Sequence, residues 1–275
     1  MAQSQLKVAI LLCGHIRTFE QCKDDFVKIF GNYDVFLDTY DKKYGYHPYI
    51  KSVLKYEEDE EMDSKQIEDA FDGVNLKRWS VENQTEVDAE VKEISNGFDK
   101  KMQPFLEGYC QYRKAARCID LMKEYEEANG FVYDICIKMR MDIICRPIIL
   151  ESVPVNTVIV DQNNVFPSDC ITIGSRDVIV KLPLLVMQEY TTPLPESEMA
   201  PPHGVFYNVV NFHLKCVFSK QNIITKLMRV VEAKQHREAP PAKQRLRSTA
   251  KQRLVPRFSK EVHLYEPPTR QYEPN

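Results

Sequence analysis

Apolar runs alternate with segments of helical spacing along the first part of the chain. The unbroken apolar run within 6–13 predicts a buried strand, and residues 19–30 have the spacing of an amphipathic helix. A second apolar run within 34–41 predicts another short strand. Strand, loop, helix and strand in this order predict a βαβ unit, whose loops lie at the carboxyl edge of a parallel sheet.

The middle of the chain continues this alternation. One strand is expected at 74–81, and a long helix over 103–128 is expected to end at Asn129-Gly130. Later strands are predicted at 133–142, 155–160 and 169–174, and later helices at 176–187 and 223–234. We therefore predict an α/β fold with a mostly parallel sheet between layers of helices.

Charge divides the chain into two parts. Residues 1–225 carry 25 basic and 35 acidic groups, whereas 226–260 hold eleven Lys or Arg and two Glu, a net charge of +9. The basic segment repeats Ala-Lys-Gln-Arg-Leu, a composition that resists compact packing. We predict one domain over 1–225 and a flexible, poorly ordered tail over 226–275, and we do not expect nucleic acid as a partner.

Composition indicates the class of protein and its compartment. A chain of 275 residues with 43% hydrophobic and 28% charged residues is typical of soluble globular proteins. The first apolar run is too short for a membrane span or a signal-peptide core. The eight cysteines form no CxxC pair, which favours buried reduced thiols over a zinc site or a disulfide framework. We expect a cytoplasmic protein without a transmembrane segment.

The loop Gly14-His15-Ile16-Arg17-Thr18 separates the first strand from the first helix. Backbone N–H groups at the helix start, the guanidinium of Arg17 and the hydroxyl of Thr18 are suited to a diphosphate. The loop is neither a Walker A motif nor a GxGxxG fingerprint, which argues against an ordinary P-loop kinase or a dinucleotide dehydrogenase. A capped turn with a surface arginine is the alternative.

The strand predicted at 133–142 ends in charged residues. Its period of two places Lys138, Arg140 and Asp142 on one side and apolar residues on the other. Two cations and a carboxylate at the carboxyl end of a strand predict a phosphate site. Asp142 is the candidate ligand for a divalent ion that bridges two phosphates, and a salt bridge to Arg140 or Arg146 is the alternative.

Further carboxylates are candidates for contacts with substrate. Asp38 and Asp41 come at the end of the second strand, where one of them would receive a nucleoside or sugar hydroxyl, or both would be solvated in a turn. A general base that deprotonates an acceptor hydroxyl would be Asp169, Glu196 or Glu198.

Together these segments resemble the small nucleotide-sugar-dependent glycosyltransferases of GT-A type, a family found in surface-polysaccharide loci and large DNA viruses. The resemblance covers about residues 6–187 and depends on the order of five segments: 8–19, 34–41, 111–134, 138–142 and 169–175. It implies a GT-A-like, Rossmann-like fold. It also implies transfer of a sugar from a UDP- or GDP-linked donor to a glycan or other hydroxyl acceptor.

The resemblance also implies roles for individual residues. The expected donor-binding residues are Gly14, His15, Arg17, Thr18, Asp38, Lys138 and Arg140. Arg140 and Asp142 correspond to the DxD motif, with Arg140 in place of its first Asp, so a Mn or Mg ion at Asp142 and leaving-group stabilisation by Arg140 both remain open. Arg140 and Asp169 are the candidate catalytic residues, Asp169 as base or as acceptor clamp.

Two other functions are alternatives. A nucleotidyl- or phosphotransferase would use the same diphosphate pocket and turn over a nucleoside triphosphate without sugar transfer. A non-catalytic binding protein would act through its basic tail and lose its partner when residues 235–275 are deleted, whereas a transferase would keep donor hydrolysis.

Overall fold

A seven-stranded sheet forms the centre of the computed structural model, which describes residues 6–43, 60–95, 103–148, 150, 153–154, 156–161, 170–191, 202–221 and 223–227. The strand order is β3-β2-β1-β4-β7-β6-β8. Its strands are β1 (Val8–Cys13), β2 (Asp34–Tyr40), β3 (Leu76–Glu82), β4 (Ile135–Met139), β6 (Thr157–Asp161), β7 (Ile171–Ser175) and β8 (Val217–Gln221). Only β7 runs antiparallel to its neighbours within this described sheet. The predicted α/β fold with a mostly parallel sheet is confirmed.

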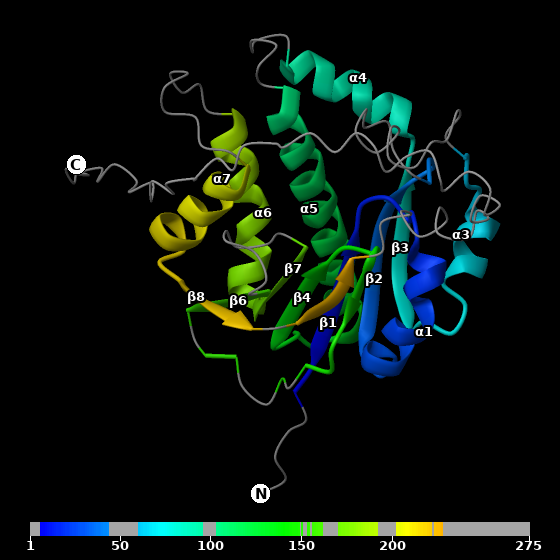
Figure 1. The fold of residues 1–275 in the computed structure, drawn as a ribbon, viewed down its shortest axis with the longest axis horizontal. Helices are drawn as coiled ribbons and strands as arrows, with labels where there is room; N and C mark the ends of the chain where they lie inside the picture. The colour runs from blue at the N-terminus through cyan, green and yellow to red at the C-terminus, as the bar shows by residue number, and fades with distance from the viewer. Residues whose placement is uncertain are drawn as a thin grey trace, which may run out of the picture. The chain divides into compact units, whose positions relative to one another are not determined.

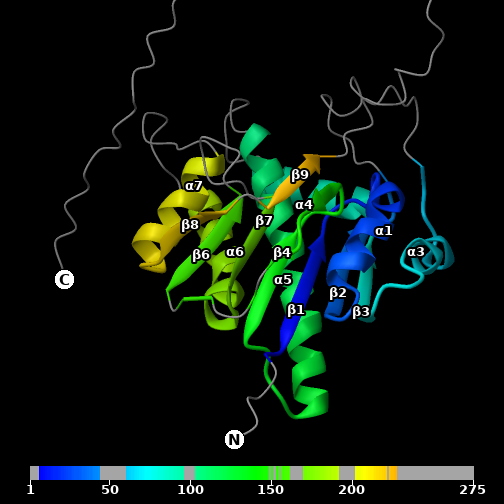
Figure 2. The same ribbon diagram turned by 60° about the horizontal axis from the view of Figure 1, so that its bottom comes forward.

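Helices cover both faces of the sheet (Figures 1 and 2). One face packs against α1 (Phe19–Phe30) and α3 (Ser64–Ala70). The other packs against α4 (Gln84–Ser95), α5 (Gln103–Asn129), α6 (Arg176–Thr191) and α7 (Pro202–Asn208), which a short π-helix (Val209–His213) follows. No helix in the described part of the chain is both long and apolar enough to cross a membrane.

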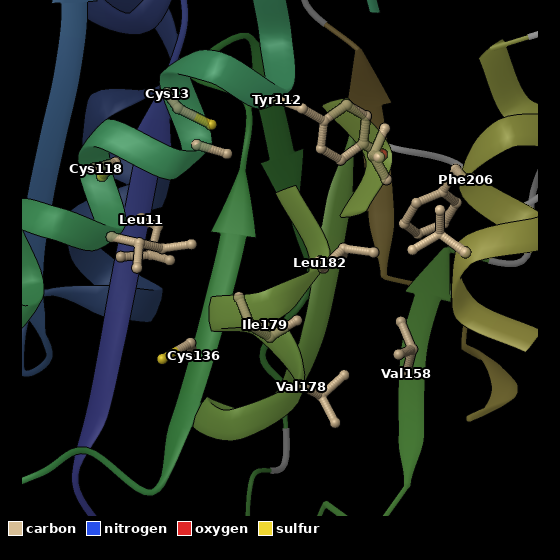
Figure 3. Close-up of a cluster of buried hydrophobic side chains, with 14 of the residues drawn as sticks. Leu11, Cys13, Tyr112, Cys118, Cys136, Val158, Val178, Ile179, Leu182 and Phe206 are labelled. Carbon is tan, nitrogen blue, oxygen red and sulfur yellow. The ribbon is translucent and has the colours of Figure 1, made fainter. Parts of the chain in front are cut away.

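The central strands are apolar on both faces, because each face is covered by helices. Leu11 and Cys13 of β1 and Cys136 of β4 face Cys118 of α5 and Ile179 of α6 (Figure 3). The alternate residues of β1 pack against α1 on the opposite face. Six of the eight cysteines are buried, as expected for side chains that behave as small hydrophobes.

The helix predicted at 223–234 is wrong at its start. Strand β9 (Ile224–Leu227) pairs there with β5 (Ile143–Cys145) in a separate two-stranded sheet. Asp161 Oδ1 accepts hydrogen bonds from the backbone N–H groups of Ile223, at 2.9 Å, and Ile224, at 2.8 Å. These contacts hold the segment extended, so tertiary structure overrides its helical spacing. The tail from residue 228 onward lies outside the described residues, and the division at 225 stays a prediction.

A buried lysine links α5 to the carboxyl ends of β2 and β3. Lys114 Nζ lies 3.3 Å from Asp38 Oδ2 and 2.8 Å from Glu82 Oε2, and all three side chains are at most 10% exposed. Nζ also donates to the Thr39 carbonyl at 2.6 Å and lies 3.8 Å from the centre of the Tyr40 ring. Burial lowers the pKa of Lys114 and raises the pKa of Asp38, and their mutual attraction opposes both effects.

We expect Lys114→Met to lower the free energy of unfolding by about 3 kcal/mol, because Asp38 would keep its burial and lose its main counter-charge. Urea denaturation measures the change. The matched control is Lys123→Met on the same helix, since Lys123 is 41% exposed and its pair with Asp120 lies at the surface; it should change stability by less than about 0.5 kcal/mol. Equal losses in both variants would contradict a structural role for the buried ammonium.

Candidate functional site

The order of the strands marks one point on the carboxyl edge of the sheet as a candidate binding site. From β1 the chain passes to β2 and β3 on one side, and β4 lies on the other side of β1. The carboxyl ends of β1 and β4 therefore meet where the strand order reverses, and open α/β sheets bind ligands at such points. The segments that leave this point are the loop of residues 14–18 and the turn of residues 140–142.

Two arginines converge there on one carboxylate. Arg140 donates to Asp142 through Nε, at 2.9 Å, and through a terminal nitrogen, and Arg17 donates to the same carboxylate at 3.4 Å. The Asp142 side chain is 5% exposed, whereas Arg17 is 22% and Arg140 is 23% exposed. The guanidinium groups thus form the accessible side of this cluster, which we call the arginine cluster.

Arg140 and Asp142 reach each other through a turn. The strand predicted at 133–142 ends at Met139, so its pleat does not align all three charged residues. Arg140 N donates instead to the carbonyl of Cys170, at 2.9 Å, just before β7. Lys138 remains within β4 and is buried beneath α5, its Nζ 5.2 Å from the centre of the Tyr112 ring. Arg140 and Asp142 lie together as expected. The prediction that a single strand aligns them with Lys138 is wrong.

The electrostatics of Asp142 follow from its partners. Burial alone would raise its pKa, but the charge and hydrogen bonds of Arg140, with the charge of Arg17, hold that pKa below its ordinary value. The salt bridge considered as the alternative for Asp142 is therefore present in this structure.

The loop after β1 has an unusual backbone. Gly14 has φ +110°, which L residues rarely adopt, and no atom would obstruct a Cβ there, so its backbone conformation accounts for the glycine. Arg17 has φ +49°, in the left-handed region that costs a non-glycine residue about 1–2 kcal/mol. A hydrogen bond from Arg17 N to the Lys43 carbonyl, at 2.9 Å, holds this conformation. Strain of this kind is common at functional sites.

Part of the backbone cradle expected at the start of α1 is already engaged within the protein. Gly14 N donates to Asp38 O at 3.1 Å, and Phe19 N donates to Ile16 O at 3.0 Å, so these amides and that of Arg17 are already used within the protein. Thr18 is the buried N-cap of α1, and its side chain makes no capping hydrogen bond. In this loop the guanidinium of Arg17 is therefore better suited to an anion than these three amides are.

His15 lies in the same loop and is held on two sides. Its ring packs against that of Tyr40 with 4.5 Å between centroids and a tilt of 30°, and its Nε2 lies 2.8 Å from Gln84 Oε1. Burial, together with the positive charge of Arg17, lowers the pKa of His15 to about 3. His15 is therefore a neutral imidazole at physiological pH.

The remaining carboxylates divide into two groups. Asp38 lies inside β2, where it is fully buried and accepts a hydrogen bond from the Ser80 hydroxyl, so the expectation that it follows the strand is wrong. Its carboxylate faces protein partners, among them Lys114. Asp169, Glu196 and Glu198 lie outside the described residues.

The described donor set at Asp142 does not fit a divalent cation. Both of its carboxylate oxygens accept hydrogen bonds from guanidinium groups, and the positive charge of these groups would repel a metal cation. Within the described residues, no group of three or more His, Cys, Asp or Glu could hold a metal ion. The Mn or Mg ion stays a prediction.

Sequence reasoning missed the residues that contact Asp38 and His15 from other elements of the fold. Lys114, Glu82 and Gln84 meet Asp38 and His15 only through contacts between distant segments. One signal was available for Lys114, which lies within the predicted helix and directly precedes Ala115, a buried residue. A lysine so close to a buried face requires a partner, but the sequence does not identify that partner.

No family model matches the chain, and no curated protein matches it. Similar solved structures include a glycosyltransferase involved in glycosylation of the major capsid of PBCV-1, with a TM-score of 0.39 and 9% identity over 78% of this chain and 82% of that one. A nucleoside-diphosphate-sugar pyrophosphorylase from Vibrio cholerae RC9 has a TM-score of 0.35 and 10% identity over 78% and 91%. The galactosyltransferase LgtC has a TM-score of 0.33 and 7% identity over 73% and 69%. At these TM-scores the three structures assign no activity to this chain.

Protonation of His15 should couple stability to pH. The folded pKa is about 3 against an ordinary 6.5, so the unfolded chain binds more protons between these values. Stability from neutral His15 is complete above pH 6.5 and decreases as the pH falls towards 3. Between about pH 7 and about pH 4.5, urea denaturation should show a loss larger by roughly 2 kcal/mol in the wild type than in His15→Phe. The other histidines are common to both proteins, so equal losses would contradict a neutral, buried His15.

Proposed function

We propose that this protein is a glycosyltransferase that transfers a sugar from a nucleoside-diphosphate sugar to a hydroxyl acceptor such as a glycan. The observation that carries the proposal is the arginine cluster at the point where the strand order reverses. Two guanidinium groups surround one carboxylate there, and the cationic groups are more accessible than the carboxylate. Such a surface is suited to the diphosphate of a nucleotide sugar.

In this proposal the protein acts mainly on the leaving group. The acceptor oxygen attacks the anomeric carbon, and the bond from that carbon to the diphosphate oxygen breaks. The electron pair stays on the nucleoside diphosphate, whose added charge Arg17 and Arg140 stabilise. The acceptor proton passes to a base, for which Asp169 is the candidate. Asp142 orients both guanidinium groups before the donor arrives, so little reorganisation is needed during the reaction.

The first test is donor binding. A thermal-shift panel of UDP, GDP, CMP and TDP sugars should show stabilisation by one nucleotide family, because a ligand that binds only the folded state raises its melting temperature. Each ligand is tested with Mn²⁺ and with EDTA. A requirement for Mn²⁺ would mean that Asp142 exchanges a guanidinium partner for a cation. Absence of binding by every member would reject the proposal.

The second test is activity. We expect Arg17→Met to lower the rate of nucleoside diphosphate release from the selected donor by about 100-fold, since one group that stabilises the leaving group is lost. The variant should remain folded, because Asp142 keeps both hydrogen bonds from Arg140. Arg140→Lys retains the charge without the planar pair of donors and should lose about tenfold.

The matched control for these variants is Arg78→Met on β3, where Arg78 pairs with Glu124 at the protein surface, 3.0 Å away. It should release the nucleoside diphosphate at the wild-type rate. A 100-fold loss in the control would assign the effect to general disturbance of the fold. Turnover of a nucleoside triphosphate without sugar transfer would instead favour a phosphotransferase.

A further inference from the structure

A chain of two hydrogen bonds fixes which nitrogen of His15 carries its proton. Gln84 Nε2 donates to Asp88 Oδ1 at 2.7 Å, and Gln84 Oε1 lies 2.8 Å from His15 Nε2. An ionised carboxylate only accepts hydrogen bonds, so Asp88 orients the amide with its NH₂ group outward and its oxygen towards His15. That oxygen also only accepts, and therefore the proton of the neutral imidazole is on Nε2.

The other ring nitrogen is then an acceptor. With one proton on a neutral ring, Nδ1 has a lone pair and no hydrogen. Among the described residues no hydrogen-bond donor faces this atom, since the contacts of His15 are those with Gln84 and Tyr40. The low pKa of His15, about 3, makes Nδ1 a weak base for proton abstraction but leaves it able to accept a hydrogen bond.

His15 is rigidly placed close to the arginine cluster. Its ring lies on Tyr40, and Tyr40 in turn lies 3.8 Å from the ammonium of Lys114. It is two residues from Arg17 in one loop, and the charges of Arg17 and Arg140 both act on it. His15 as a whole residue is half-buried, so this part of the loop borders on solvent beside the cluster.

We propose that His15 selects the base of the donor nucleotide by accepting a hydrogen bond at Nδ1 from a ring N–H group. Uracil and thymine carry such a group at N3, and guanine carries one at N1. Cytosine has a bare N3 instead, which would place two acceptors opposite each other and leave both without a partner. This inference rests on the proposed function, which requires a nucleoside diphosphate beside the arginine cluster.

The test is a set of affinities measured by isothermal titration calorimetry. The ligands are UDP, GDP and CDP, with N3-methyl-UDP and N1-methyl-GDP as probes in which only the ring N–H is removed. We expect CDP to bind at least about tenfold more weakly than the better of UDP and GDP. The methylated form of that better ligand should lose a similar factor, because a site built to accept a hydrogen bond rejects an analogue that lacks the donor.

The variant Asp88→Asn keeps His15 but removes the group that fixes its tautomer, so it tests the role of that tautomer. In Asp88→Asn the side chain at position 88 can donate as well as accept, so the Gln84 amide is no longer fixed and Nδ1 is not held as an acceptor. Discrimination against CDP and the methylated probe should fall below about threefold, and affinity for inorganic pyrophosphate should stay unchanged. The matched control is Asp120→Asn, an exposed carboxylate that pairs with Lys123 on α5, which should keep full discrimination.

A direct readout of the proton is available from ¹⁵N NMR of the histidine rings. The His15 resonances, assigned by their loss in His15→Phe, should show an unprotonated Nδ1 and a protonated Nε2 at neutral pH. A protonated Nδ1 would overturn the inference, and so would equal binding of UDP, GDP, CDP and the methylated probes. Failure of every nucleoside diphosphate to bind would overturn the proposed function together with it, so the two failures are distinguishable.

Discussion

One buried ammonium group connects the long helix to the functional edge of the sheet. Lys114 projects from α5 and contacts Asp38 of β2, Glu82 of β3 and the face of Tyr40. A helix held against a sheet by apolar contacts alone can shift along it at modest cost, because dispersion contacts are not directional. The two charge contacts of Lys114 and its hydrogen bond to the Thr39 carbonyl fix the position of α5 on the sheet. The Tyr40 ring, which Lys114 contacts, packs in turn against His15. The position of His15 at the site therefore depends on a charged contact inside the core.

The local charge of the site opposes that of the chain around it. Residues 1–225 carry ten more acidic than basic groups, yet the accessible part of the arginine cluster is cationic. The carboxylate of Asp142 is less exposed than the two guanidinium groups, and its negative charge reduces the repulsion between them. The accessible guanidinium groups attract an anionic ligand to this edge of the sheet. Burial first, and then the positive charge of Arg17, lower the pKa of His15, so it is uncharged beside this cluster.

The main strands, the two longest described helices and the segments that line the site could be predicted from local patterns. Continuous apolar runs identify β1, β2 and β4, and Asn129-Gly130 identifies the end of α5. Contacts between distant segments could not be predicted, since periodicity does not indicate that Lys114 meets Asp38 or that Gln84 meets His15. For this reason the partners of Asp38 and of the loop amides within the protein could not be predicted. Local sequence shows which groups are available, and tertiary contacts decide which are already occupied.

The single reversed strand has a consequence for how such a protein could diversify. Because β7 runs against its neighbours, the connection from β6 to β7 joins two adjacent strands at the carboxyl edge, next to Arg140. In a wholly parallel sheet that connection would need a crossover helix, and its length would be tied to the packing of a layer. Two adjacent antiparallel strands impose no such constraint on the chain that joins them. Evolution, or an engineer, can lengthen or exchange it beside the site while the cores on both faces of the sheet stay intact.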